Sequence, residues 1–341
     1  MNRRHFLKTG TIALFASSFA EKLFASKASH QTTAPFGPVT CENTLPGKTD
    51  SKPVYLNASE ASNQEDLKVL FLGTGAAGWK SDGSSPRRNS SILLEDKLLI
   101  DFTISVEDML PSDIHPKEIF YTHSHGDHYQ PERALLLGIK TVYLSETWID
   151  RATKDFKSAA ANTGLSVPTI IPLKLYEPIN IHGLTITPLP ANHCTSDYNE
   201  QALIYLIEKG TTEEKLGVRL LYATDTGGIM GRASKPAGID SHKSNTTPRA
   251  ITAFVMEATM GMGHDEDFRI FNHSSANTVS RIANMLIATK HYLPPAGQPV
   301  YLTHISPGLH DNKSQEALNN SLPNPLRAAY DGLEVVFKAV E

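Results

Sequence analysis

Short apolar runs and longer segments of helical spacing alternate along the chain from Leu67 onward. The short runs are rich in Val, Ile, Leu, Tyr and Phe, which predicts β-strands, some of them buried on both faces. The predicted strands are residues 67–72, 90–95, 97–102, 117–122, 141–145, 184–189, 202–208, 219–224, 250–257 and 299–304. Two segments, residues 145–164 and 274–293, have the spacing of amphipathic helices, each with a serine available as N-cap. The pattern predicts a mixed α/β layered domain over residues 66–341, without internal repeats.

The sequence GTGAAG, Gly73–Gly78, matches the dinucleotide-binding pattern G-x-G-x-x-G after a predicted strand. That pattern holds a pyrophosphate only when a helix begins directly after it. The next residues, WKSDGSSPRRNSS, contain glycine, proline and paired serines, which oppose a helix. We therefore interpret the glycines as a tight turn at a strand end.

The first 28 residues have the features of an export signal. Basic residues precede an apolar run, Thr9 to Ala20, that is too short to span a bilayer comfortably. Arg3 and Arg4, followed by Phe-Leu-Lys, resemble the twin-arginine signal, although Asn2 stands where that signal usually has Ser or Thr. We expect residues 1–28 to be a signal peptide read by the twin-arginine export machinery, and the mature protein to be periplasmic. An N-terminal anchor helix that is never cleaved is the alternative.

Residues 29–65 are rich in Ser, Thr, Pro and Asn without periodic apolar spacing, which predicts a polar spacer. The formal net charge of the chain is −4, and residues 1–28 carry five Lys or Arg and one Glu, so their removal leaves −8. An acidic mature protein lacks the basic face of nucleic-acid binders, so we expect no nucleic-acid partner.

The two cysteines, Cys41 and Cys194, allow one disulfide at most, which excludes a cysteine-stapled scaffold. Cys194 directly follows His193 and could be a metal ligand or the neighbour of one. We expect it to be a buried residue with no role in binding.

The sequence YTHSHGDHYQ, residues 121–130, concentrates potential metal ligands in six positions. His123 and His125 are two residues apart, so on an extended segment both rings would point to the same side. Asp127 and His128 follow Gly126, where the chain can turn and bring a second pair toward the same centre. Imidazole nitrogens and carboxylate oxygens are natural ligands of Zn²⁺ and similar divalent metals. The spacing predicts a metal site rather than a polar surface loop.

Two metal sites require further ligands, and three candidates stand directly after predicted strands. His193 ends LTITPLPANH, Asp225 ends RLLYATD and His304 ends PVYLTH. Each alone would be interpreted as a surface or core residue. Together with the first motif, they indicate one site.

The segments LLID, THSHGDH, NH, YATDT and LTH, in this order, resemble the metallo-β-lactamase-fold hydrolases. The resemblance implies an α/β fold of the αββα four-layer sandwich type, with two divalent metal ions along one sheet edge. It implies His123, His125 and His193 on one metal, Asp127, His128 and His304 on the other, and Asp225 as the bridge. Asp101 matches an aspartate that supports the histidine loop without binding metal. Zinc is the expected metal, with manganese or iron as alternatives.

Residues 256–283 resemble the paired His-Glu-Ala-Thr and His-Ser-Thr boxes of ribonuclease Z and its phosphodiesterase relatives. The match to the first box begins at Glu257, because Met256 stands where that box has its histidine. The match to the second box begins at His273, and Ser275 stands where that box has its threonine. FLGTG and RNSSILLE are similar to the phosphoribosyl cyclic phosphodiesterases. No long basic arm for tRNA is visible, which favours a small or cyclic phosphodiester as the substrate.

Two divalent metals would supply a bridging hydroxide and neutralise phosphate oxygens. We expect Asp127 or Asp225 to orient that hydroxide. His273 is the candidate for binding a phosphoryl oxygen or protonating the leaving group, with Glu257 as its orienting partner; a helix cap on the surface is the alternative for His273. His264 and His310 could line the substrate pocket, although we expect both to face solvent.

The sequence therefore predicts an exported dinuclear metal-dependent hydrolase, a phosphodiesterase acting on a small molecule. A lactone, thioester or β-lactam hydrolase with the same metals is the second hypothesis, and an iron-dependent redox protein is the third. A non-catalytic metal-binding module is disfavoured because no ligand position is missing. The sequence is compatible with a monomer or a dimer.

Overall fold

The computed structural model describes residues 64–239 and 249–340. The predicted signal peptide, residues 1–28, and the predicted spacer up to residue 63 lie outside the described residues. The strands are β1 (Leu67–Gly73), β2 (Ser91–Leu94), β3 (Leu98–Ile100), β4 (Glu118–Phe120), β5 (Thr141–Ser145), β6 (Thr169–Leu173), β7 (Ile179–Ile181), β8 (Leu184–Pro190), β9 (Leu203–Lys209), β10 (Val218–Ala223), β11 (Ala253–Glu257), β12 (Val300–Thr303), β13 (Leu326–Ala328) and β14 (Leu333–Phe337).

The α-helices are α1 (Pro131–Leu137), α2 (Ile149–Thr163), α3 (Gly231–Ser234), α4 (Ala276–Ala288) and α5 (Gln315–Ser321). Short 3-10 helices are η1 (Ile104–Met109), η2 (Glu146–Trp148), η3 (Phe268–Phe271) and η4 (Pro307–His310). Within the described part of the chain, no helix has the length and apolar character needed to cross a membrane.

The strands form two sheets of seven strands each. The first has the order β14-β1-β2-β3-β4-β5-β6, and the second has the order β13-β12-β11-β10-β9-β8-β7. The run from β3 to β6 is parallel in the first sheet, as is the run from β10 to β13 in the second. Because parallel neighbours end at the same edge, residues that follow β3 and β4, or β10, β11 and β12, gather at one edge of their sheet.

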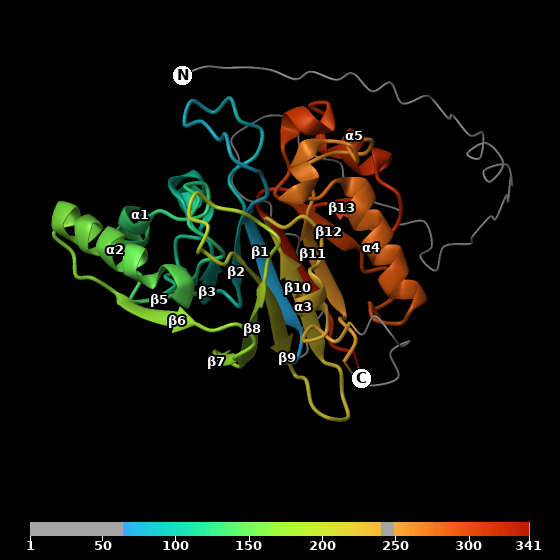
Figure 1. Ribbon diagram of the computed structural model, residues 1–341, viewed down its shortest axis with the longest axis horizontal. Helices are drawn as coiled ribbons and strands as arrows, with labels where there is room; N and C mark the ends of the chain where they lie inside the picture. Colours follow the sequence, from blue (N-terminus) through green and yellow to red (C-terminus); the bar gives the residue numbers. More distant parts are fainter. Residues whose placement is uncertain (1–63, 240–248, 341) are drawn as a thin grey trace, which may run out of the picture. The chain divides into compact units, whose positions relative to one another are not determined.

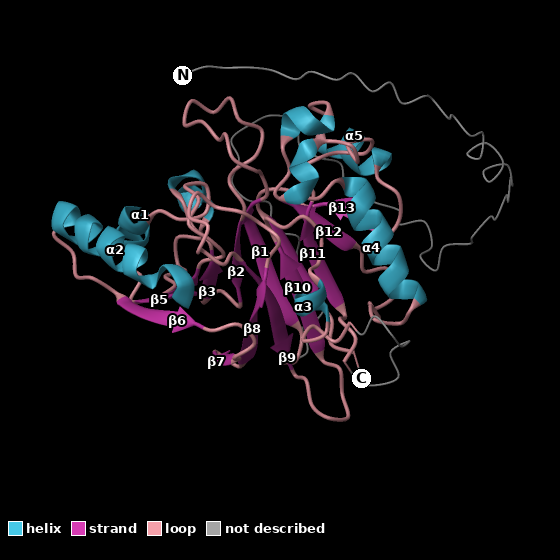
Figure 2. Ribbon diagram, viewed as in Figure 1, coloured by secondary structure: helices cyan, strands magenta, loops and turns pink. Residues whose placement is uncertain are grey.

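The layers follow from strands that are apolar on both faces. In β1, Val69 and Phe71 pack between the two sheets, whereas Leu70 and Leu72 pack on the opposite face with α1, α2 and η1. In β10, Leu220 faces the space between the sheets and Leu221 faces a cluster that includes α3, α4 and α5. Figures 1 and 2 show the helices on the two outer flanks and the strands between them. The predicted αββα sandwich is confirmed.

The two predicted helices are present, and their capping follows the sequence. Ser275 is the N-cap of α4, and its hydroxyl accepts a hydrogen bond from the Thr278 amide. Ser145 caps the short η2, which leads directly into α2. The α2 helix ends at Gly164, whose φ of 71° is a left-handed conformation that favours glycine.

The loop after β1 contains the GTGAAG sequence and leads into no helix before η1. A Cβ atom at Gly73 would lie 2.0 Å from the Asn89 carbonyl oxygen, so the close approach of two backbone segments requires glycine there. The loop returns to the sheet through a hydrogen bond from the Gly75 amide to the Arg88 carbonyl. The predicted turn at this strand end is confirmed, and no helix begins directly after these glycines.

Candidate metal centre

The predicted ligands meet because they all follow strand ends. His123 lies shortly after β4 and His193 after β8, while Asp225 and His304 follow the adjacent parallel system of β10, β11 and β12. Asp225 and His304 have φ angles of 46° and 50°, and Asp101 after β3 has 58°. Left-handed backbone is uncommon outside glycine, so the surrounding structure must hold these three residues in place.

One group of side chains joins the histidine motif to β8. Ligand atoms of His123, His125 and His193 lie within 4.8 Å of one another. The His193 Nε2 atom lies 3.2 Å from His125 Nδ1. Three imidazoles at this separation can face a single divalent cation.

A second group lies beside the first. Asp127 Oδ2 is 3.5 Å from His128 Nε2 and 3.6 Å from His304 Nε2. Asp225 Oδ2 lies 2.6 Å from His128 Nε2, 3.1 Å from His304 Nε2 and 4.0 Å from His123 Nε2. Asp225 therefore touches members of both groups, as a bridging carboxylate would. The structure brings together all seven residues that the sequence predicted as ligands.

The buried atoms at this centre fit a cation. Nε2 of His123, His128 and His304 and Oδ2 of Asp225 are all buried, and none of them makes a hydrogen bond. The contact of 2.6 Å between His128 Nε2 and Asp225 Oδ2 is an ion pair when His128 is protonated. Because a buried polar atom without a partner is costly, this convergent set of N and O atoms fits divalent metal ions.

The carboxylates close to His128 shift the pKa values of the histidines in the site. Burial lowers the pKa of His128, but the charges of Asp225, Asp127 and Asp101 outweigh it and hold that pKa well above its usual value. Burial and the neighbouring His128 keep the pKa of His123 well below its usual value. A proton on His128 thus offsets the carboxylates, and a divalent cation would supply the same compensation and release that proton.

Oxygen atoms behind the imidazoles fix which ring nitrogen faces the centre. Asp101 accepts from His128 Nδ1 at 2.8 Å and from the Thr122 hydroxyl at 2.8 Å, and that hydroxyl lies 3.0 Å from His123 Nδ1. In the same way, Glu257 accepts from the Thr259 hydroxyl at 2.5 Å, and Thr259 lies 2.8 Å from Nδ1 of His304. A hydroxyl that donates to a carboxylate must accept from the ring, so Nε2 is left free to bind metal. Asp101 has the supporting position that the sequence predicted.

Glu200 supports the histidine loop in a way that the sequence did not reveal. Its side chain is fully buried. One carboxylate oxygen accepts from the Ser124 amide at 2.7 Å, and the other accepts from the hydroxyls of Ser124 at 2.5 Å and Thr195 at 3.0 Å. Ser124 separates His123 from His125, and Thr195 lies two residues after His193. A single carboxylate therefore ties together the two loops that carry the first group.

We expect Glu200→Gln to weaken metal binding by about 10- to 100-fold, because the amide nitrogen cannot accept from the two hydroxyls. Titration of the metal-free protein with Co²⁺, followed by its visible absorption, measures this affinity directly. Glu146→Gln, at an exposed glutamate, is the matched control and should bind Co²⁺ like the wild type. An unchanged affinity in Glu200→Gln would show that the contacts do not position the ligands.

His273 lies at the open side of the centre, with its side chain 20% exposed. Its Nδ1 atom is 3.2 Å from Glu257 Oε1 and 3.3 Å from Asp225 Oδ1. Burial lowers its pKa, but the hydrogen bond and charge of Glu257, with the charge of Asp225, raise it to about 9. The predicted pairing of His273 with Glu257 is present, whereas α4 begins only at Ala276, so His273 is not a surface helix cap.

Glu257 is fully buried at the end of β11 and has further partners. Oε1 accepts from the Thr226 amide at 2.8 Å and Oε2 from the Thr259 amide at 3.1 Å. It therefore links the residues after β10, the His304 side of the centre and His273. Both carboxylate oxygens of Glu257 are occupied by these hydrogen bonds, so neither is free to bind a substrate.

Two expectations need correction, those for Cys194 and His310. Cys194 is exposed rather than buried, and its amide donates to the Asn272 side chain. His310 is buried rather than solvent-facing, because it donates from Nε2 to the Ala258 carbonyl at 2.7 Å. His264 is half-buried. Neither Cys194 nor His310 belongs to a metal-binding group among the described residues.

No model of a known protein family matches the sequence, and no curated protein sequence matches it. The solved structures that are similar to this chain include the following three. The metallo-β-lactamase fold protein YhfI from Bacillus subtilis aligns with a TM-score of 0.55 at 16% identity, covering 80% of this chain and 99% of that one. Zn²⁺-bound PqqB from Methylobacterium extorquens aligns with a TM-score of 0.55 at 17% identity, covering 79% and 99%.

A long form of RNase Z from yeast aligns with a TM-score of 0.53 at 14% identity, covering 82% of this chain and 43% of that one. The shared architecture extends over nearly all of the residues that the structure describes. Together with two seven-stranded sheets between outer helices and the ligand cluster at their edge, these similarities establish that the chain has the metallo-β-lactamase fold.

Proposed function

We propose that this protein is a metal-dependent hydrolase that cleaves small phosphodiesters at a centre of two divalent cations. His123, His125 and His193 would hold one cation and Asp127, His128 and His304 the other, with Asp225 shared between them. The observation that carries the proposal is a set of four buried atoms without hydrogen bonds, in which Nε2 of His123, His128 and His304 lie within 4.0 Å of Asp225 Oδ2. When bound, the cations would lower the pKa of a water molecule and neutralise phosphate oxygens. The Zn²⁺-bound state of PqqB supports zinc as the metal.

The charge of the site favours an anionic phosphoryl group over the neutral carbonyl group of a lactone or β-lactam. Two divalent cations and a protonated His273, whose side chain is 20% exposed, would present positive charge at the open side of the centre. That charge complements the negative charge of a phosphodiester.

His273 is positioned to act on the leaving group. Its raised pKa keeps the imidazole protonated at neutral pH, and its partial exposure makes it accessible to a bound molecule. Glu257 holds Nδ1, so the other ring nitrogen is available to donate a proton to the departing oxygen or a hydrogen bond to the phosphate. Asp127 is the remaining candidate for orienting the attacking water, because Asp225 is enclosed by three histidines.

A panel of substrates tests this function. The metal-loaded protein is expected to hydrolyse bis(4-nitrophenyl) phosphate and cyclic phosphodiesters, and a chelator should abolish the activity. Lactones, thioesters and β-lactams should be turned over at least about 100-fold more slowly, because their scissile carbonyl group lacks the negative charge that the site complements. Rapid lactone hydrolysis without phosphodiester hydrolysis would favour the second hypothesis of the sequence analysis instead.

We also propose that the protein is exported to the periplasm by the twin-arginine machinery. The support is the sequence of residues 1–28, and this route suits a protein that binds its metal before export. Replacement of Arg3 and Arg4 by lysine should retain the protein in the cytoplasmic fraction, whereas unchanged fractionation would contradict the proposed route.

A further inference from the structure

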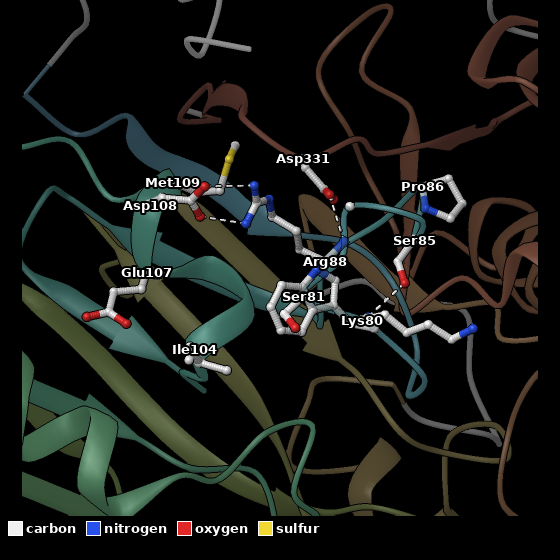
Figure 3. Close-up of a pocket in the computed structure, with 12 residues that line it drawn as sticks. Lys80, Ser81, Ser85, Pro86, Arg88, Ile104, Glu107, Asp108, Met109 and Asp331 are labelled. Atoms are coloured by element: carbon white, nitrogen blue, oxygen red, sulfur yellow. Dashed lines mark hydrogen bonds and ion pairs between the residues drawn. The ribbon is translucent and has the colours of Figure 1, made fainter. Parts of the chain in front are cut away.

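A pocket of about 710 Å³ lies apart from the proposed metal ligands. One wall is the loop of residues 79–88, and the other is η1. The Arg88 side chain crosses between the walls and makes two contacts with Asp108, of 2.5 and 2.9 Å, as Figure 3 shows. Arg88 also donates to the Ser105 carbonyl. This bidentate ion pair fixes the two walls relative to each other, so the pocket is a defined feature of the fold.

Both walls are bonded to loops that carry the metal centre. The Ile104 amide, at the start of η1, donates to the Gln130 side chain at 2.9 Å, and Gln130 donates to the Gly126 carbonyl within the histidine motif. On the other side, Gly75 and Ala76 pair with Ile305, which directly follows His304. Hydrogen bonds therefore connect the segments that form the pocket to the histidine motif and to the residue after His304.

The lining suits a flat aromatic ring with polar edges. Trp79 is half-buried in the wall, and its ring contacts no other aromatic ring among the described residues. Ile104 and Met109 add apolar surface. Arg88 is neutralised by Asp108, whereas Lys80 has no ion pair within the part of the chain that the structure describes. A volume near 700 Å³ is in the range of small-molecule sites.

We propose that this pocket binds the base of a nucleotide, stacked on Trp79, with Lys80 donating to a carbonyl or ring nitrogen of the base. The assignment rests on the proposed function and narrows it, because the substrate is then a phosphodiester of a nucleoside rather than of a simple alcohol or sugar. Stacking on an indole accepts purines and pyrimidines alike, so the pocket selects for a base without selecting strongly among bases.

Binding of adenosine 5′-monophosphate to the metal-loaded protein tests the assignment without requiring turnover. Calorimetry should show at least about fivefold weaker binding in Trp79→Ala and near wild-type binding in Trp79→Phe, which keeps a ring. Ribose 5-phosphate, which lacks the base, should bind the three proteins equally. Wild-type tryptophan fluorescence should change with the nucleotide, and Trp79→Phe should lose that change because its remaining indole, Trp148, is buried.

Equal binding of the nucleotide by the wild type and Trp79→Ala would overturn the assignment, as would equal binding of nucleotide and ribose 5-phosphate by the wild type. The same preparations assayed with bis(4-nitrophenyl) phosphate separate this inference from the proposed function. Trp79-dependent binding without hydrolysis would support the pocket and contradict phosphodiesterase activity. Hydrolysis without Trp79-dependent binding would overturn the pocket alone.

Discussion

Asp225→Ala is expected to reduce bound metal and to lower phosphodiester hydrolysis by at least about a thousandfold, or roughly 4 kcal/mol in the barrier. The physical reason is its central position, because Oδ2 contacts the histidines of both proposed groups. Without this carboxylate, both proposed cations would lose a ligand and the charge between them would no longer be offset. Metal content after dialysis and the rate of bis(4-nitrophenyl) phosphate hydrolysis measure the two effects.

Asp225→Asn separates the charge of this residue from its shape, and we expect it to lose metal as well. Asp113→Ala, at an exposed aspartate away from the ligand groups, is the matched control and should keep both metal and activity. Retention of two metal ions per chain in Asp225→Ala would show that this residue does not bridge the cations.

His273→Ala is expected to keep both metals and to lower kcat by about 10²- to 10⁴-fold, the usual contribution of a general acid. The side chain contacts Asp225 and Glu257 but is not among the seven proposed ligands. Metal analysis and steady-state kinetics of the same preparation give both quantities. His115→Ala, at an exposed histidine, is the control for loss of an imidazole elsewhere.

The pH profile gives a sharper test of His273. Because Glu257 raises the pKa of His273, the imidazole is charged at neutral pH and loses its proton at alkaline pH, so kcat should fall on the alkaline side. His273→Ala should lack this alkaline limb. Glu257→Gln removes a charge that raises the pKa of His273, so the limb should move to lower pH. If the alkaline limb persisted unchanged in His273→Ala, the group that titrates there would not be His273.

The fold could be predicted largely because its strands are buried on both faces and therefore appear as continuous apolar runs. All ten predicted strands are present, with boundaries that differ by a few residues. The structure adds β6, β7, β13 and β14, which the sequence did not indicate. Of these, β6 and β7 have partly exposed residues and no clear apolar run, so their pairing depends on neighbouring strands rather than on their own pattern.

The seven ligand candidates could be predicted because metal chemistry restricts residue types and because parallel strands deliver them to one edge. Of the residues behind them, Asp101 could be predicted from the resemblance, but others could not. Glu200 lies in a polar loop, where a glutamate usually faces solvent, and only the fold brings it to Ser124 and Thr195. The burial of His310 could not be predicted either, because its hydrogen-bond partner is a backbone carbonyl, and a backbone group leaves no signal in a sequence.

The central claim is that two divalent cations at this centre support phosphodiester hydrolysis. Titration of the metal-free protein with Zn²⁺, with bound metal and bis(4-nitrophenyl) phosphate hydrolysis measured at each addition, tests it most directly. We predict that hydrolysis is absent without metal and reaches its maximum when two ions are bound per chain. Two bound ions without hydrolysis of any phosphodiester, or hydrolysis that persists in the metal-free protein, would contradict it.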